Sequence, residues 1–162
     1  MRYNKATTEN LDEKTKEAIE DAITKQKGIF IFGDTGTGKT YTMHALANHK
    51  KVYVDNWVIL LSKFRDLMQK GEYFMSIHDF TNEDYVFIDD IGAEKTSDFV
   101  VEFLYTIINK RYENMKRTVL STNLTLEDFG ERYGDRILSR IAEMCIFLEL
   151  KGEDQRLIIN KK

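Results

Sequence analysis

Short apolar runs alternate with longer amphipathic stretches along most of the chain. The runs are four to six residues long and lie at residues 29–32, 51–55, 85–90, 118–122 and 145–150. Uninterrupted runs of this length predict strands that are buried on both faces. Between them, apolar residues recur every three or four positions and predict helices over 41–49, 57–69, 97–111 and 134–144. Strands that alternate with helices indicate an α/β fold with a parallel sheet.

The amphipathic pattern also predicts which side chains face inward. In the helix at 57–69, we expect the inner face to consist of Val58, Leu61, Phe64, Leu67 and Met68. In the helix at 97–111, the buried stripe is Val100, Phe103, Leu104, Ile107 and Ile108. A helical turn is expected at 126–129, before the last helix.

The first 27 residues precede the first predicted strand. We expect residues 1–10 to form a loose arm and residues 11–23 to form a helix with one narrow apolar stripe. Such a helix either packs on the edge of the sheet near the site or docks a partner, and helical periodicity does not separate these alternatives.

Composition narrows the class of protein. The chain has 162 residues, of which 42% are hydrophobic and 31% are charged, which is typical of a single soluble globular domain. Its net charge of −3 does not attract nucleic acid, so DNA binding would need a local patch. The best basic cluster is Lys110, Arg111, Lys116 and Arg117, for which a solvated helix end is the alternative.

Targeting and redox signals are few. The start of the chain has no signal peptide, and no apolar run approaches the length of a membrane span. The single cysteine, Cys145, cannot form an internal disulfide and fits a reducing, cytoplasmic location.

The first candidate site lies between the first predicted strand and the helix after it. Residues 33–40 match the pattern G-x-x-x-x-G-K-[ST] in its expected strand–loop–helix context. The glycines let backbone N–H groups turn towards phosphate oxygens, and the helix dipole favours the same anion. Lys39 would reach the β- and γ-phosphates, and the Thr40 hydroxyl would bind Mg²⁺. The predicted nucleotide contacts are Gly33, Asp34, Thr35, Gly36, Thr37, Gly38, Lys39, Thr40 and Tyr41.

Polar side chains end two other predicted strands. Asp89 and Asp90 follow the third, and ligands in open α/β sheets bind at that end of the strands. We expect Asp89 to join the Mg²⁺ shell and Asp90 to orient or deprotonate the attacking water. Asn123 ends the fourth strand, and its carboxamide could contact both water and phosphate. The alternatives are an acidic loop start and a strand-terminating turn, with Thr122 as the second candidate at this tip.

Two arginines complete the candidate site. Arg136 and Arg140 are four residues apart and therefore lie on one face of a helix. Such a pair is usually a solvated surface. The alternative is an arginine finger that one subunit supplies to the γ-phosphate of the next, because a planar bidentate cation suits that task.

These motifs together resemble one family. The segment Phe87-Ile88-Asp89-Asp90-Ile91-Gly92-Ala93-Glu94 is similar to the Walker-B segment of bacterial and phage helicase loaders of the DnaC/DnaI type and of the IstB transposition helper. The resemblance continues through residues 109–112, 121–124, 135–141 and 152–156 and covers about residues 28–158. It implies an AAA+ P-loop fold with five parallel strands in the order 5-1-4-3-2. It also implies a sensor-1 role for Asn123 and an arginine-finger role for Arg140, with Arg136 as neighbour or stand-in. Arg156 lies in a family motif without an assigned role.

The resemblance also implies a function. We expect an ATP- and Mg²⁺-dependent ATPase of phage DNA replication that forms a homo-oligomer with ATP and contacts a replicative helicase, with single-stranded DNA as a further candidate partner. The expected parts are the arm and helix at 1–27, the ATPase core at 28–158 and a tail at 159–162. Only about 27 residues precede the first predicted strand, so we expect no helicase-binding domain in this chain, and we expect no helical lid after the core. Asp90 stands where AAA+ proteins usually have Glu. The alternatives are an IstB-type transposition helper and a nucleotide-dependent binding module with negligible hydrolysis.

Overall fold

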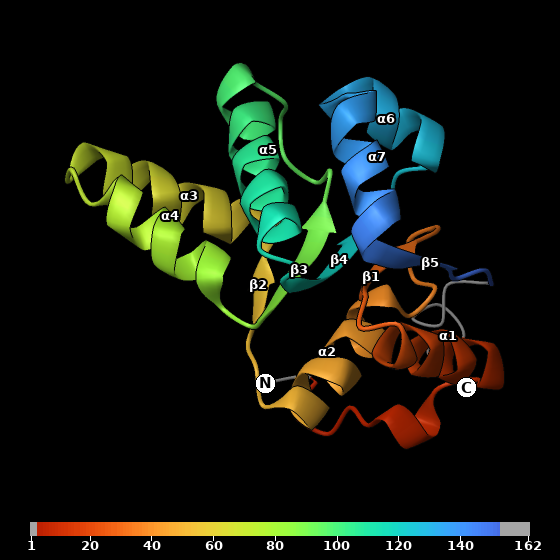
Figure 1. Cartoon of the computed structure of the whole chain (residues 1–162). Coiled ribbons are helices and arrows are strands. Elements are labelled where there is room, and N and C mark those ends of the chain that lie inside the picture. Colours follow the sequence, from red (N-terminus) through yellow and green to blue (C-terminus); the bar gives the residue numbers. More distant parts are fainter. Residues whose placement is uncertain (1–2, 153–162) are drawn as a thin grey trace.

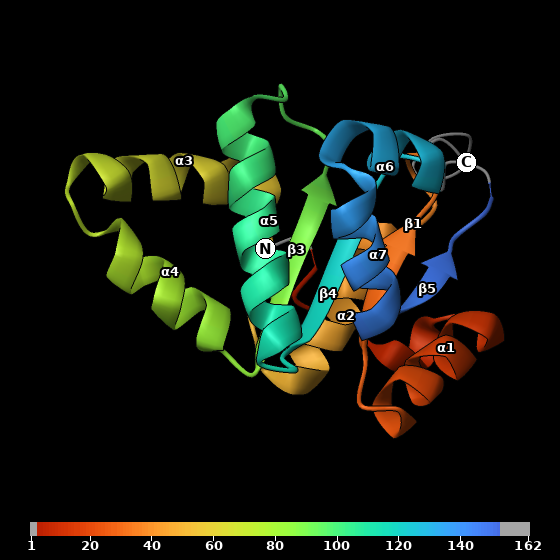
Figure 2. The same ribbon diagram turned by 45° about the horizontal axis from the view of Figure 1, so that its top comes forward.

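A parallel five-stranded sheet forms the centre of the computed structural model, which describes residues 3–152 (Figure 1). The strand order is β2-β3-β4-β1-β5, which confirms the predicted order read from the other edge. The strands are β1 (Gly28–Phe32), β2 (Val54–Asn56), β3 (Tyr85–Ile91), β4 (Arg117–Thr122) and β5 (Cys145–Glu149). Because all of them are parallel, their carboxyl ends lie along one edge, as Figure 2 shows.

Helices cover both faces of the sheet (Figures 1 and 2). One face is covered by α1 (Glu13–Thr24) and α2 (Lys39–Lys50). The other is covered by α3 (Trp57–Gln69), α4 (Tyr73–Asn82), α5 (Asp98–Glu113), α6 (Leu126–Tyr133) and α7 (Asp135–Met144). Side chains alternate between the faces, so Phe30 packs under the second group while Ile29 packs under the first. No helix within residues 3–152 is long and apolar enough to cross a membrane.

The pattern located most helices correctly and misjudged two of them. The helix α3 has the predicted bounds, but its buried face is formed by Trp57, Leu60, Leu61 and Phe64. Val58 and Met68 are 44% and 49% exposed, so their predicted inward position is wrong. The sequence pattern missed α4 altogether, because only Ile77 and Thr81 of this helix are buried.

The segment before α1 is packed on the core. The Tyr3 ring stacks on His44 of α2 at 4.8 Å between centroids, and Asn48 Nδ2 donates to the carbonyl oxygens of Tyr3 and Ala6. Ala6 and Leu11 are buried. The expectation of a loose arm is therefore wrong for residues 3–10. The helix α1 itself packs on β1 and β5, in agreement with the sheet-edge alternative.

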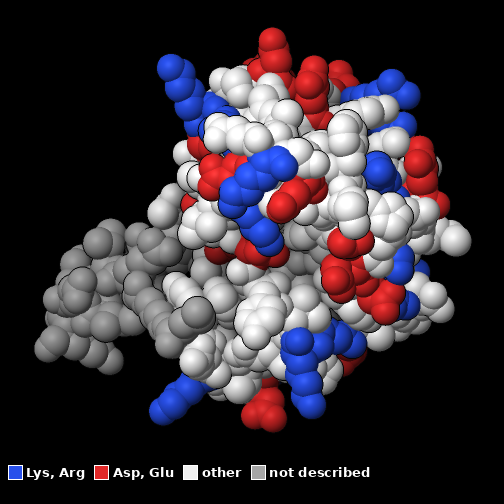
Figure 3. Space-filling view, turned by 90° about the vertical axis from the view of Figure 1, so that its left-hand side faces the viewer, with Lys and Arg blue, Asp and Glu red and all other residues white. Residues whose placement is uncertain are grey.

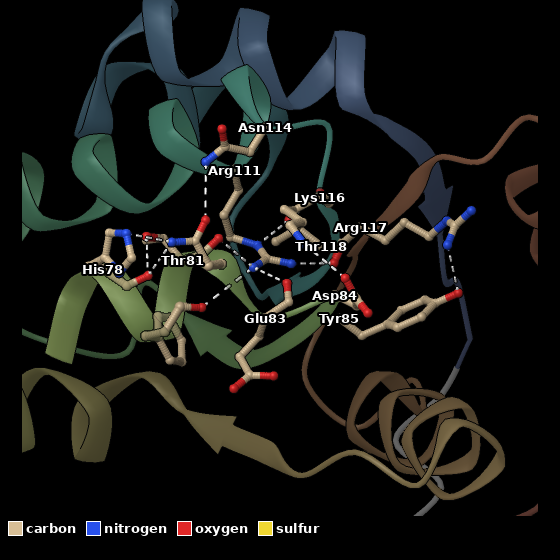
Figure 4. A network of polar contacts seen from close by, with 12 residues as sticks. His78, Thr81, Glu83, Asp84, Tyr85, Arg111, Asn114, Lys116, Arg117 and Thr118 are labelled. Atoms are coloured by element: carbon tan, nitrogen blue, oxygen red, sulfur yellow. Dashed lines mark hydrogen bonds and ion pairs between the residues drawn. The ribbon is translucent and has the colours of Figure 1, made fainter. Parts of the chain in front are cut away.

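The predicted basic cluster has one buried member, and two others contact neighbouring side chains (Figure 4). Arg111 is fully buried, Lys116 forms an ion pair with Asp84 at 2.8 Å, and Arg117 donates to the hydroxyl of Tyr85. Lys and Arg are interspersed with Asp and Glu on the face viewed from the side of α3 and α4 (Figure 3). The interpretation as a solvated helix end is wrong for Arg111, which is buried, and DNA binding through the other three cations stays a prediction.

The buried Arg111 joins three elements of the chain. It donates to the Thr118 hydroxyl of β4 at 2.8 Å and to the carbonyl oxygens of Thr81, Glu83 and Arg117 at 3.1, 2.8 and 2.6 Å (Figure 4). Burial lowers the pKa of Arg111 to about 10, which leaves the side chain charged at neutral pH. These bonds fix the end of α4 and the start of β4 against α5.

We expect Arg111→Ala to lower the free energy of unfolding by about 3–5 kcal/mol, because the carbonyl acceptors would stay buried without a donor. Urea unfolding measures the change. The neighbouring Lys110→Ala is the control, with an expected change within about 0.5 kcal/mol. Equal effects of the two variants would show that the buried network does not stabilise the fold.

Candidate functional site

The loop from residue 33 to 40 joins β1 to α2 at the carboxyl edge of the sheet. Gly33, Gly36 and Gly38 have φ angles of +139°, +85° and +98°. A Cβ atom on Gly33 would lie 2.1 Å from the carbonyl oxygen of Leu150, so the close approach of the chain after β5 requires glycine there. The helix α2 begins at Lys39, which places the positive end of its dipole at the loop.

Side chains of the loop hold it in a closed turn. The Lys39 Nζ donates to the carbonyl oxygens of Gly33 and Asp34 at 2.6 and 2.5 Å. The Thr37 hydroxyl donates to the same Asp34 oxygen at 2.9 Å. The hydroxyl of Tyr41 accepts from the segment before α1, at 3.4 Å from the Thr7 backbone nitrogen. The loop thus holds the Lys39 ammonium group against its own backbone carbonyl groups.

A bulge at the end of β3 positions the two carboxylates. Ile88 pairs with Leu120 and Ile91 pairs with Thr122, so β3 has one residue more than β4 over this stretch. Asp90 accommodates the bulge with a φ of +66°, a region that Asp tolerates better than most residues.

Hydroxyl groups of β4 hold this bulge. Ser121 Oγ accepts from the Asp90 backbone nitrogen at 2.9 Å and donates to Asp89 Oδ1. The Thr122 hydroxyl donates to the Ile91 carbonyl oxygen at 2.6 Å. Thr122, the second candidate at this tip, therefore has a structural contact.

Asp89 and Thr40 lie together, as expected of a metal site. The Thr40 hydroxyl donates to Asp89 Oδ2 at 2.9 Å, and Asp89 is 8% exposed. Within residues 3–152 there is no group of three or more His, Cys, Asp or Glu side chains that could hold a metal alone. A hydroxyl and one carboxylate fit Mg²⁺, which completes its shell with phosphate and water oxygens.

Asp90 and Asn123 meet across the tips of β3 and β4. Asn123 Nδ2 donates to Asp90 Oδ1 at 2.6 Å. Burial raises the pKa of Asp90, the Asp89 charge raises it further, and Lys39 and Asn123 oppose the change. The structure thus brings the loop, Asp89, Asp90 and Asn123 into one site.

The two arginines are not part of this cluster. The guanidinium groups of Arg136 and Arg140 lie 5.5 and 5.1 Å from the ring centre of Tyr105 on α5, and that of Arg140 also lies 5.8 Å from Tyr112. The Arg140 Nη1 is buried and has no hydrogen-bond partner in the part of the chain that the structure describes. Arg156 lies outside the described residues.

A buried polar cluster behind the bulge was not predicted. Glu94 accepts from the Gly92 backbone nitrogen at 3.0 Å, from Arg132 at 3.2 Å and from the Tyr133 hydroxyl at 2.5 Å. Its side chain is 5% exposed, and burial and Glu94 raise the pKa of Tyr133. The cluster ties the segment after β3 to α6. The sequence contained one sign that Glu94 matters: it is the last residue of the segment 87–94, which carries the family resemblance.

Sequence comparisons find proteins that are similar to this chain. A family model described as "IstB-like ATP binding protein" matches residues 2–162. A protein of insertion sequence IS5376 from Geobacillus stearothermophilus is 28% identical over 145 residues, covering 83% of this chain and 57% of that protein. The phage-like element PBSX protein XkdC of Bacillus subtilis (strain 168) is 31% identical over 140 residues, covering 80% and 51%. The chain therefore spans about half the length of these relatives.

A solved structure also has a fold similar to that of this chain. The crystal structure of the DnaC helicase loader superposes with a TM-score of 0.76 at 26% identity, covering 93% of this chain and 99% of that one.

We expect Asp90→Asn to stabilise the nucleotide-free protein at pH 7. A carboxyl whose pKa is raised by folding destabilises the fold while it is ionised, and this cost vanishes below its ordinary pKa of 3.8. Asn never ionises and can still accept from Asn123. Thermal unfolding should give Asp90→Asn the higher Tm at pH 7, with a gap that narrows towards pH 4.

The exposed Asp66→Asn is the matched control, since Asp66 makes no side-chain hydrogen bond or ion pair with residues 3–152. A Tm gap for Asp90→Asn that is constant with pH would contradict the electrostatic cause.

We expect Glu94→Gln to cost about 1–3 kcal/mol of unfolding free energy, because it leaves the Arg132 charge without its partner. Urea unfolding measures the loss, with exposed Glu131→Gln as the control. In an Arg132→Met background, Glu94→Gln should cost much less. An equal cost in both backgrounds would show that the ion pair is not responsible.

Proposed function

The chain belongs to the IstB-like ATP-binding family of AAA+ P-loop proteins, and from this premise we propose that it is a Mg²⁺-dependent ATPase of the helicase-loader type. Two side-chain contacts at the carboxyl edge of the sheet support this proposal. Thr40 meets Asp89 at 2.9 Å, and Asn123 meets Asp90 at 2.6 Å, beside a loop that fits phosphates.

In the proposed mechanism, each side chain has a separate task. Lys39 leaves the two loop carbonyl groups and binds the β- and γ-phosphates. Thr40 and Asp89 would hold Mg²⁺, which would supply positive charge to stabilise the charge that develops on the phosphate oxygens. Asp90 orients the attacking water and accepts its proton, while Asn123 fixes the direction of the carboxylate.

We propose that a second copy completes the site. Arg136 and Arg140 pack on α5 rather than on the loop of their own chain, which supports a role towards a neighbour's nucleotide. We favour Arg140 over Arg136 because its Nη1 is buried without a hydrogen-bond acceptor among the described residues. A γ-phosphate oxygen could accept a hydrogen bond from this nitrogen. The stacking on Tyr105 and Tyr112 would then be the resting position of Arg140.

The proposed cellular role is in DNA replication, with a replicative helicase as partner. The likeness to the DnaC helicase loader supports this role, and the likeness to PBSX protein XkdC supports a phage setting. A transposition helper is the second candidate, since one relative belongs to an insertion sequence. Pull-down of the ATP-loaded protein against a replicative helicase and against a transposase separates the two roles.

We expect ATP turnover per protomer to rise with protein concentration if the site forms between copies. Lys39→Ala should abolish nucleotide binding, and Arg140→Ala should bind nucleotide but lose about 10³-fold or more in turnover. A mixture of these two inactive variants should recover activity, because one supplies the loop and the other supplies Arg140. Fluorescent ATP binding and phosphate release are the two measurements.

Two results would contradict parts of this scheme. If the mixture stays inactive while Arg140→Ala alone turns over normally, the arginine does not act across an interface. If Asp90→Asn retains wild-type function in partner binding, the protein works as a nucleotide-dependent binding module and hydrolysis is not needed.

A further inference from the structure

A cavity of about 500 Å³ lies between α1 and α2, on the face of the sheet that these helices cover. None of its lining residues belongs to the nucleotide loop or to the cluster of Asp89, Asp90 and Asn123. Its floor is a row across three neighbouring strands, where Ile29 pairs with Val119 and Val119 pairs with Phe87. Its walls are apolar and consist of Ile19, Ala22 and Ile23 of α1 and Leu46 of α2. This volume lies in the range of ligand-binding pockets.

The rim of the cavity at the amino ends of the strands is cationic. Arg117 and Tyr85 each precede a floor residue of their own strand by two positions, so strand alternation places them on the face of the floor, and Lys27, directly before β1, also lines the cavity. Arg117 donates to the Tyr85 hydroxyl at 3.1 Å, as Figure 4 shows, and Lys50 Nζ lies 5.4 Å from the centre of that ring.

Three cations of the rim form no ion pair among the described residues. Lys27, Lys50 and Arg117 form no ion pair with any carboxylate in residues 3–152. Lys16 also lines the cavity but is paired with Glu13 at 2.9 Å, so the three cations without an ion pair face two carboxylates, Glu9 and Glu20, in a chain whose net charge is −3. The apolar floor and the excess of cations together favour an occupant that is both apolar and acidic.

The depression is longer than this cavity. A second cavity of about 720 Å³ shares Lys27, Gly28 and Arg117 with it and continues past the amino ends of the strands to Met115, which is 89% exposed. Ile23, at the boundary of the first cavity, is 54% exposed and extends the apolar surface outward. An elongated occupant matches this shape better than a compact small molecule.

We propose that the depression between α1 and α2 binds a linear segment of a partner protein in which a large apolar side chain lies beside Asp or Glu. The apolar side chain enters the cavity over Ile29, Phe87 and Val119. The adjacent carboxylates pair with Lys27 and Lys50, and Arg117 remains held by Tyr85 at the junction of the two cavities. This site is independent of the proposed ATPase activity.

The test is selection of phage-displayed random linear peptides on the full chain, with ADP and Mg²⁺ present. Selection is repeated on Lys27→Glu/Lys50→Glu and on the control Lys63→Glu/Lys70→Glu, which has the same charge change on and just after α3. We expect enriched peptides to combine large apolar and acidic residues. Their affinity, measured by fluorescence anisotropy, should fall at least about tenfold on the first variant and stay unchanged on the control.

A second pair of variants tests the apolar half. Ala22→Phe would fill the cavity and should abolish peptide binding while the protein keeps its Tm. If that variant fails to fold, Ile23→Asp changes an exposed position of the same rim and should weaken binding by a similar factor.

Several outcomes would overturn the proposal. One is that enriched peptides lack acidic residues or bind both double variants alike. Another is competition by a single-stranded oligonucleotide or by a synthetic peptide of residues 153–162, which would identify a different occupant. A third is that the fluorescent sulfonate ANS binds in a Lys27- and Lys50-dependent manner while no peptide is enriched, which would assign the depression to small amphiphilic anions.

Discussion

The candidate site depends on the hydroxyl group of Ser121. In a regular strand, Asp89 and Asp90 would point to opposite faces of the sheet, and only one of them could face the phosphate loop. The extra residue in β3 changes this, and Ser121 holds it by accepting from the Asp90 backbone and donating to the Asp89 carboxylate. An apolar residue at position 121 would leave that backbone N–H without a partner in a buried strand end. One hydroxyl therefore allows both carboxylates to serve the same site.

The sequence was sufficient to predict which residues would meet, because parallel strands end at a common edge. Asp89, Asp90 and Asn123 follow apolar runs directly, and the strand order places β4 between β3 and β1. The contacts that fix their directions could not be predicted in the same way. The register shift in β3 adds one residue to a run of buried side chains, and the sequence pattern of such a run does not reveal it. The stacking of Arg140 on Tyr105 joins two separate helices, so the periodicity of either helix does not predict it.

Two errors of the sequence-based prediction share one physical origin: the pattern treats charged residues as exposed and apolar residues as buried. Arg111 is charged and yet fully buried, because carbonyl groups from α4 and β4 surround it. In α4, Phe74 and Met75 are apolar and yet 82% and 77% exposed, so the helix has no clear inward stripe. These two deviations lie side by side in the fold, since Arg111 holds the end of the helix that the pattern missed.

One face of the sheet carries both the candidate nucleotide site and the proposed peptide site. Strand alternation places Tyr85, Phe87 and Asp89 of β3 on this face, in the order rim, floor and nucleotide site. The helix α2 spans the same distance, since its first turn holds Thr40 and its later turns line the cavity with Leu46 and His49. An occupant of the cavity would therefore contact the helix whose first turn carries Thr40 of the candidate nucleotide site. A peptide that shifted α2 would change nucleotide affinity, and by linkage nucleotide would change peptide affinity by the same factor, whereas a peptide that leaves α2 in place binds independently of nucleotide.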